Sequence, residues 1–242
     1  MTRQSFTYGD ERIDYDVLFS KERRGKIAIH VHPDASVQVD APEGEALAKI
    51  HKAVLKRARW IGRHVNDAKD RRRHVLPRAY VSGETHFYLG RRYALKVHGA
   101  NGSSHGVKFY RGAIHVTSPG KNAGEIKKQL RSWYRERATA VFAQRFEELS
   151  GRIVWLRAEP KWRLVAMKTQ WGSCSPQGAI LLNPHLIKAP RECIDYVILH
   201  ELCHLREHNH SQRYYRLLSQ LMPRWKSVKA RLDGMAELLL NE

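Results

Sequence analysis

His200 and His204 stand four residues apart with Glu201 between them, and this spacing is the feature of the chain that most directly predicts chemistry. On a helix, residues at i and i+4 project from the same face, so both imidazoles can bind one metal ion. Glu201 lies on the same helix and can reach a water molecule at the open coordination position. The motif therefore predicts a zinc-dependent hydrolase.

The surroundings of this motif strengthen the prediction. The motif alone is weak evidence, because the chain has 14 histidines and such a pattern arises by chance at a frequency of roughly 0.05 per chain of this composition. Residues 194–199, however, have the apolar character of a buried helix, and Pro190 suits its first turn. A glutamate on such a helix is costly to bury unless it is paired or near a metal, which favours a metal site over a purely structural helix.

Three residues compete for the role of third ligand. A helix that continued past His204 would bring Glu207 to the metal-facing side, whereas a turn would deliver His208 or His210. The turn is favoured because Asn209 tolerates the left-handed conformation that ends helices. The interval from His204 to His210 also equals that of the metzincin motif, although Glu207 stands where that motif has glycine. We predict His210 as the third ligand, with Glu207 as the main alternative.

Further short motifs surround these histidines in a fixed order. They occupy residues 170–175 (Gln-Trp-Gly-Ser-Cys-Ser), 178–183, 186–190, 194–198, 200–204 and 209–211. In this order, the stretch from 168 to 225 resembles the YgjP-like metallopeptidases, which are related to the SprT-type zinc proteases. The resemblance implies a zincin-like catalytic domain that cleaves a protein or peptide substrate. It also implies that His200, His204 and His210 bind the metal and that Glu201 is the catalytic acid/base.

A β-hairpin is predicted before the metal-binding helix. Short apolar runs at 164–166 and 179–182 flank the segment 171–178, whose residues are typical of turns. In zincin-like proteins such a strand borders the cleft, where an extended peptide can add by backbone pairing.

By resemblance, the loop 171–175 forms part of the wall of the site. The candidates for substrate binding or for stabilising the oxyanion are Trp171, Gly172, Ser173, His185 and Tyr215. The alternative interpretation makes Trp171 a core anchor and Ser173 an ordinary turn residue.

The order of the remaining segments predicts an α+β fold. Alternating segments predict antiparallel strands at 13–17, 26–32 and 36–39, followed by a helical stretch over 44–74. Further strands are expected near 87–89, 93–97, 107–110 and 113–116, and helical spacing covers 122–150. We expect an antiparallel β-rich N-terminal portion packed on a zincin-like, mainly helical catalytic portion that contains the β-hairpin. No internal repeat is evident.

A domain boundary is expected at residues 118–120, where the sequence reads Ser-Pro-Gly. It divides the chain into a β-rich portion with a long basic helix, 1–120, and a zincin-like metallopeptidase domain, 121–242.

The formal net charge of +19, from 43 basic and 24 acidic residues, is the second global signal. Ten of the basic residues lie in the helical stretch: Lys49, Lys52, Lys56, Arg57, Arg59, Arg63, Lys69, Arg71, Arg72 and Arg73. Such a helix could lie along a polyanion and gain affinity from the release of counterions. Nucleic acid or another acidic partner is one interpretation. A solvated surface is the other, because no base-reading motif is visible.

Cysteine usage and the absence of apolar runs predict a soluble cytoplasmic protein. Three cysteines leave one unpaired, and no two have the C-x-x-C spacing of a structural zinc site. The N-terminus does not resemble a signal peptide, and no apolar run is long enough to span a membrane.

The expected activity is therefore that of a Zn²⁺-dependent metalloprotease. Two alternatives stay open. A zinc-dependent hydrolase of nucleotides or other phosphate compounds could use the same ligands, and a nucleic-acid-binding module could use the metal structurally. An open coordination position and Glu201 argue against the second, because structural zinc sites are usually closed by four protein ligands.

Overall fold

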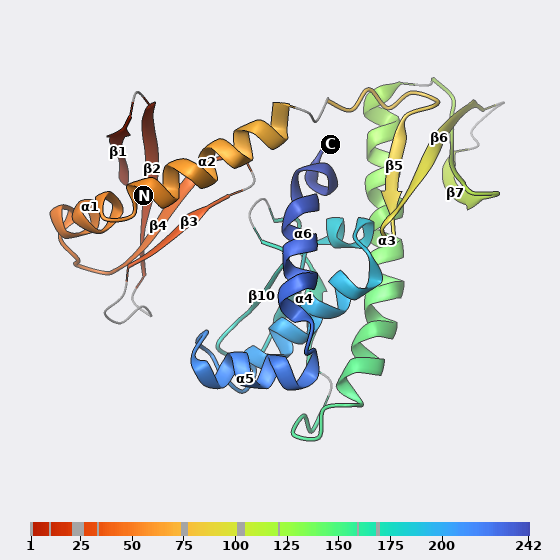
Figure 1. The fold of residues 1–242 in the computed structure, drawn as a ribbon. Coiled ribbons are helices and arrows are strands. Elements are labelled where there is room, and N and C mark those ends of the chain that lie inside the picture. Colours follow the sequence, from red (N-terminus) through yellow and green to blue (C-terminus); the bar gives the residue numbers. More distant parts are fainter. Residues whose placement is uncertain are drawn as a thin grey trace. The chain divides into compact units, whose positions relative to one another are not determined.

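The computed structural model describes residues 2–9, 11–20, 27–32, 34–73, 77–100, 105–120, 122–158, 160–167 and 170–242. The chain forms two compact units, Met1–Leu76 and Pro77–Glu242 (Figure 1). Helices and short sheets occur in both units, so the expected α+β class is confirmed. Among the described residues, no helix combines the length and the apolar character needed to cross a membrane.

The first unit is a four-stranded sheet followed by two helices. Its strands are β1 (Thr2–Tyr8), β2 (Glu11–Ser20), β3 (Ala28–Val31) and β4 (Val37–Pro42), in the order β1-β2-β4-β3, and its helices are α1 (Leu47–Leu55) and α2 (Ala58–Arg73). Alternation along β2 buries Ile13, Tyr15 and Val17 on one face. Ile50 of α1 and Ile61 of α2 belong to the same core cluster, so the helices cover this face of the sheet.

Two expectations for this unit were wrong in detail. The strands are not all antiparallel, because β2 pairs parallel to β4. The chain reverses direction twice between them, as β3 runs antiparallel to β4 at the edge of the sheet. The helical stretch over 44–74 is also interrupted between Leu55 and Ala58. An unbroken helix of that length would extend about 46 Å, whereas a strand of ten residues spans only about 33 Å.

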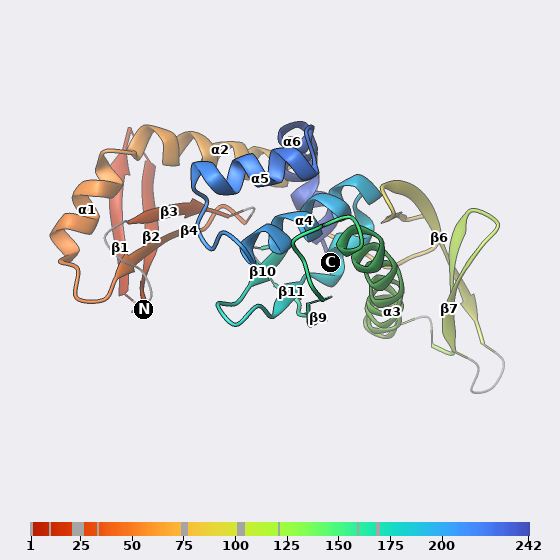
Figure 2. The same ribbon diagram turned by 90° about the horizontal axis from the view of Figure 1, so that it is seen from below.

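The second unit begins with a sheet and a long helix. The strands are β5 (Thr85–Tyr88), β6 (Arg91–Gly99), β7 (Gly106–Tyr110) and β8 (Ala113–Ser118), in the order β5-β6-β8-β7, and the helix is α3 (Ala123–Ser150). The predicted helix over 122–150 is confirmed. The Asn122 side chain caps it by accepting hydrogen bonds from the backbone N–H groups of Gly124 and Glu125. Figures 1 and 2 show α3, in green, beside this sheet.

The two four-stranded sheets share one topology, a repeat that the sequence did not reveal. In each, the first and second strands are antiparallel, the second and fourth are parallel, and the third and fourth are antiparallel. A helical segment follows the fourth strand in both units. The chain thus contains the same ββββα arrangement twice.

The remaining elements of the second unit form the part that carries the histidines. They are β9 (Trp162–Leu164), β10 (Gly172–Cys174), β11 (Ile180–Leu182), the 3₁₀ helix η1 (Pro184–Lys188), α4 (Arg191–His204), α5 (Gln212–Leu221) and α6 (Trp225–Leu240). The short strands form a three-stranded sheet in the order β10-β11-β9.

The predicted hairpin was assigned to the wrong pair of strands. β9 pairs parallel to β11, and the hairpin is formed by β10 and β11. The turn is confined to residues 175–178, where the Gly178 N–H donates to the Ser175 carbonyl oxygen at 2.9 Å. The turn was expected to span all of 171–178, but residues 172–174 form the edge strand β10.

The boundary between the units also differs from the predicted position between residues 120 and 121. The strands β5–β8, α3, η1 and α4 contribute to one core cluster, which includes Leu95, Phe142, Ile187 and Ile198. The turn between β5 and β6 is joined to η1, because the Gly90 N–H donates to the Lys188 carbonyl oxygen at 3.0 Å. Residues 77–120 therefore fold with the part that carries the histidines.

Phe142 tests this core directly. It is fully buried in α3, so Phe142→Ala should lower the free energy of unfolding of the chain by about 3–5 kcal/mol. Glu136→Ala, at an exposed position of the same helix, should change it by less than about 0.5 kcal/mol. Denaturant titration of both variants measures the difference. Equal effects would contradict the assignment of Phe142 to the core.

Candidate metal centre

The helix α4 and the turn after it place the three histidines. α4 buries residues on all sides, among them Ile194, Val197, Ile198 and Leu202, which fixes its position in the core. It ends at His204, and α5 begins after Ser211, whose hydroxyl accepts a hydrogen bond from the Tyr214 N–H at 3.3 Å. The chain therefore turns back within a few residues and brings His210 to α4.

The ending of α4 does not use Asn209 in the way the sequence suggested. Leu205 follows the helix in the right-handed conformation, and Asn209 is not among the described residues with a positive φ. Instead, the Glu207 N–H donates to the Cys203 carbonyl oxygen at 2.9 Å. The turn is thus formed without a left-handed residue.

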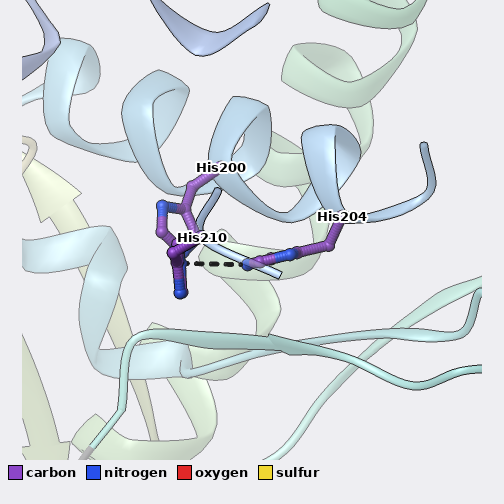
Figure 3. A group of neighbouring side chains, drawn as sticks. All are labelled: His200, His204 and His210. Carbon is purple, nitrogen blue, oxygen red and sulfur yellow. Dashed lines mark hydrogen bonds between the residues drawn. The ribbon is translucent and has the colours of Figure 1, made fainter. Parts of the chain in front are cut away.

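The three imidazoles converge through their Nε2 atoms (Figure 3). The His210 Nε2 lies 3.1 Å from the His200 Nε2 and 3.2 Å from the His204 Nε2. A tetrahedral zinc ion with Zn–N bonds of about 2.0–2.1 Å would separate two ligand atoms by about 3.3 Å. The cluster therefore fits a single ion. Glu207 and His208, the alternatives for the third ligand, are not part of this cluster.

The environment of the histidines favours their neutral, metal-binding form. The His204 Nδ1 lies 3.1 Å from the Glu207 carbonyl oxygen, to which its N–H can donate, so the Nε2 keeps its lone pair free. Burial lowers the pKa of His200 to about 3 and lowers the pKa of both His204 and His210. At neutral pH the three rings are accordingly uncharged.

Tyr214 packs against the three histidines, a role that the sequence did not predict. Its fully buried ring stacks on His204 with centroids 4.6 Å apart and meets the His210 ring edge-on at 4.7 Å. Its hydroxyl donates to the His200 carbonyl oxygen at 3.1 Å. One side chain thus contacts all three histidines. The available sequence signal was its position three residues after the helix-capping Ser211.

Glu201 is buried against the backbone of β10. The Glu201 side chain is buried in the core. This burial raises the pKa of its carboxyl group to about 8. A Cβ atom added to Gly172 would lie 2.6 Å from the Glu201 Oε1. Only glycine allows so close an approach, so the backbone of β10 lies directly beside the carboxyl group.

The other predicted site residues fall into two groups. Trp171 and Ser173 flank Gly172 and are half-buried, and Tyr215 stacks on His210 with centroids 6.0 Å apart while 40% exposed. His185 lies elsewhere. Within the described part of the chain, its ring nitrogens contact the Lys188 Nζ at 3.0 Å and the Glu242 Oε1 at 3.3 Å. The structure therefore does not bring His185 to the histidine cluster.

The two cysteines nearest the site are suited to packing. Cys203 is buried within α4, and Cys174 is half-buried on β10. Burial raises the pKa of the Cys203 thiol to about 12 and that of Cys174 to about 11. Neither thiol is therefore a thiolate at neutral pH.

The sequence model of the family described as YgjP-like, metallopeptidase domain, matches residues 25–235. The chain belongs to the YgjP-like metallopeptidase family. The resemblance noted in the sequence is confirmed, and as a YgjP-like protein the chain is a metallopeptidase, whose family implies a divalent metal ion.

Other comparisons add little to the YgjP-like assignment. No curated protein matches the chain. Among solved structures, the chain is similar to the crystal structure of the metallopeptidase zymogen of Pyrococcus abyssi abylysin, with 24% sequence identity and a TM-score of 0.34. That match covers 42% of this chain and 94% of the other.

Gly172 provides a test of the contact between β10 and Glu201. The methyl group of Gly172→Ala would overlap the Glu201 carboxyl, and relieving the overlap should lower the free energy of unfolding by about 1–3 kcal/mol. The control is Gly234→Ala in α6, where an added Cβ has no atom within 4 Å, and it should be neutral or stabilising by up to about 1 kcal/mol. Denaturant titration measures both. A neutral Gly172→Ala variant would show that the strand does not press on the carboxyl.

Proposed function

We propose that the protein hydrolyses peptide bonds in a zinc-dependent reaction, with His200, His204 and His210 as the metal ligands and Glu201 as the acid/base. The observation that carries this proposal is the convergence of three imidazoles, with the His210 Nε2 3.1 Å from the His200 Nε2 and 3.2 Å from the His204 Nε2, on the helix that also carries the buried Glu201. Three neutral ligands leave a fourth coordination position open, which is typical of catalytic rather than structural zinc sites.

His200, His204 and His210 would hold the ion. The His204 ring is fixed by the Glu207 carbonyl oxygen and by stacking on Tyr214. The metal, when bound, polarises the substrate carbonyl and lowers the pKa of a bound water. The lowered pKa values of the histidines leave their Nε2 lone pairs available for this at neutral pH.

Glu201 moves the proton in this mechanism. Burial raises the pKa of Glu201 to about 8, and the positive charge of a bound metal would lower it, so that the carboxylate can accept a proton and return it. Glu201 takes the proton from the water whose oxygen attacks the carbonyl carbon, and it then donates that proton to the amide nitrogen. The C–N bond breaks as the amine departs, and the new C–O bond becomes part of the carboxylate product.

The edge strand β10 suits the binding of an extended peptide. β10 pairs with β11 on one side and stands at the edge of its sheet, so its other side can pair with the substrate backbone. Trp171, Gly172 and Ser173 would then line the substrate, and Tyr215 would lie at its flank near His210. Backbone amides of residues 171–175 and the Tyr215 hydroxyl are our candidates for stabilising the oxyanion.

The ligand set is tested by measuring bound zinc. His200→Ala, His204→Ala and His210→Ala should each lose tight binding of one zinc ion per chain, because two imidazoles cannot complete the site. His208→Ala and Glu207→Ala are the matched controls, since both leave the cluster and the Glu207 carbonyl oxygen in place. Metal analysis after dialysis gives the stoichiometry. Loss of zinc in either control with retention in His210→Ala would contradict the proposed third ligand.

The reaction is tested by an unbiased digest of proteins, peptides and nucleotides with the wild-type chain and Glu201→Gln. The amide cannot accept the proton from water, so peptide cleavage should fall by a factor of about 10²–10⁴ while bound zinc and melting temperature are retained. Unchanged cleavage would contradict the role of Glu201. Glu201-dependent hydrolysis of phosphate compounds without peptide cleavage would favour the phosphohydrolase alternative.

A further inference from the structure

The two helices of the first unit present faces of opposite character. Ile50 and Val54 of α1 and Ile61 and Val65 of α2 are buried in the core of this unit. Exposed basic residues lie along the same segment, and we give the name basic stripe to four of them: Lys52 in α1, Lys56 in the turn between the helices, and Arg59 and Arg63 in α2. Arg59 and Arg63 stand four residues apart and therefore project from one side of α2. Exposed positive charges thus occur on both helices and in the turn that joins them.

The charge of the basic stripe is not neutralised locally. Within the described residues, none of its four members forms an ion pair, whereas Lys49 and Lys69, outside the stripe, pair with Glu45 and Glu11. Between residues 46 and 73 the sequence has ten basic residues and only two acidic ones, Asp67 and Asp70. Neither α1 nor α2 has an acidic residue in its first turn. The surface is thus complementary to a polyanion.

An aromatic side chain lies within the basic stripe. Trp60 directly follows Arg59 and is 41% exposed. Its ring is in contact with His64, with centroids 4.3 Å apart and an interplanar angle of 32°. An exposed indole among cationic side chains is the arrangement on which an unpaired base can stack while the phosphates contact the surrounding charges.

The repeated ββββα arrangement shows that this face is not a requirement of the fold. In the second unit the helix at the corresponding place, α3, buries Trp133, Phe142 and Phe146 in a core shared with α4. In the first unit the equivalent segment keeps an apolar side toward its own sheet and carries unpaired charge on the other. The same arrangement supports the histidine-bearing part in one unit and exposes a basic surface in the other.

We propose that the basic stripe and Trp60 bind single-stranded nucleic acid, with Lys52, Lys56, Arg59 and Arg63 along the phosphates and Trp60 stacked on a base. A membrane surface fits less well, because the apolar side of these helices is buried in the core and cannot insert into lipid. Duplex nucleic acid fits less well, because its bases are already stacked and paired. This activity is independent of the proposed peptide hydrolysis.

The test compares two variants that lose the same charge. One replaces Lys52, Lys56, Arg59 and Arg63 with glutamine, and the other replaces four exposed basic residues of the second unit, Lys96, Lys128, Arg152 and Arg157. Fluorescence anisotropy with a labelled 20-nucleotide oligo(dT) should show at least a tenfold weaker affinity for the first variant and less than a threefold change for the second. The slope of log K against log salt should flatten by about 3 for the first variant, at about 0.7 for each lost phosphate contact.

Trp60→Ala gives an independent reading with no change of charge. It should weaken binding of oligo(dT) by a factor of about 5–100, as expected for the loss of one stacked base, and leave the weaker binding of duplex DNA unchanged. Equal losses in the two glutamine variants would overturn the proposal, because they would show attraction by net charge alone. Absence of oligo(dT) binding by the wild-type chain, or binding of phosphatidylserine vesicles instead, would overturn it as well.

Discussion

The close approach of three imidazole rings is the constraint on which the rest of the second unit depends. Uncharged rings can share this space, whereas protonated ones would repel one another, and burial keeps them uncharged. The rings of His200 and His204 are positioned by the helix α4. His210 lies in the turn between α4 and α5, directly before Ser211, which caps α5. Tyr214 then fills the space behind all three. The site is thus positioned by packed elements rather than by a flexible loop.

The local features of this site could be predicted from the sequence, and the non-local ones could not. The projection of His200 and His204 from one side of α4 follows from their spacing of four residues, and the cap of α3 follows from Asn122. The strand β10 was missed because Gly-Ser-Cys has no intrinsic preference for a strand, and its conformation comes from pairing with β11. The contact of Gly172 with Glu201 joins two segments about thirty residues apart, and no local pattern encodes it.

The boundary between the units illustrates the same limit. Ser-Pro-Gly at 118–120 has the composition of a linker, but it only joins β8 to α3 within one core. The repeated strand order was also invisible, because a shared topology needs only the same alternation of buried and exposed positions and not the same residues. What distinguishes the two copies is what their helices pack against, because α3 shares its core with η1 and α4 as well as its own sheet, whereas α1 and α2 pack on their own sheet and carry exposed basic residues. This difference suggests how one arrangement can serve two roles in a chain.

The central claim is that His200, His204 and His210 surround one ion with an open fourth position. The most direct measurement is a crystal structure of the zinc-loaded protein with anomalous diffraction recorded at the zinc edge. The account predicts one anomalous peak about 2.0–2.1 Å from the three Nε2 atoms, with water as the remaining ligand. A peak ligated by Glu207 or His208 in place of His210, or closed by a fourth protein side chain, would contradict it.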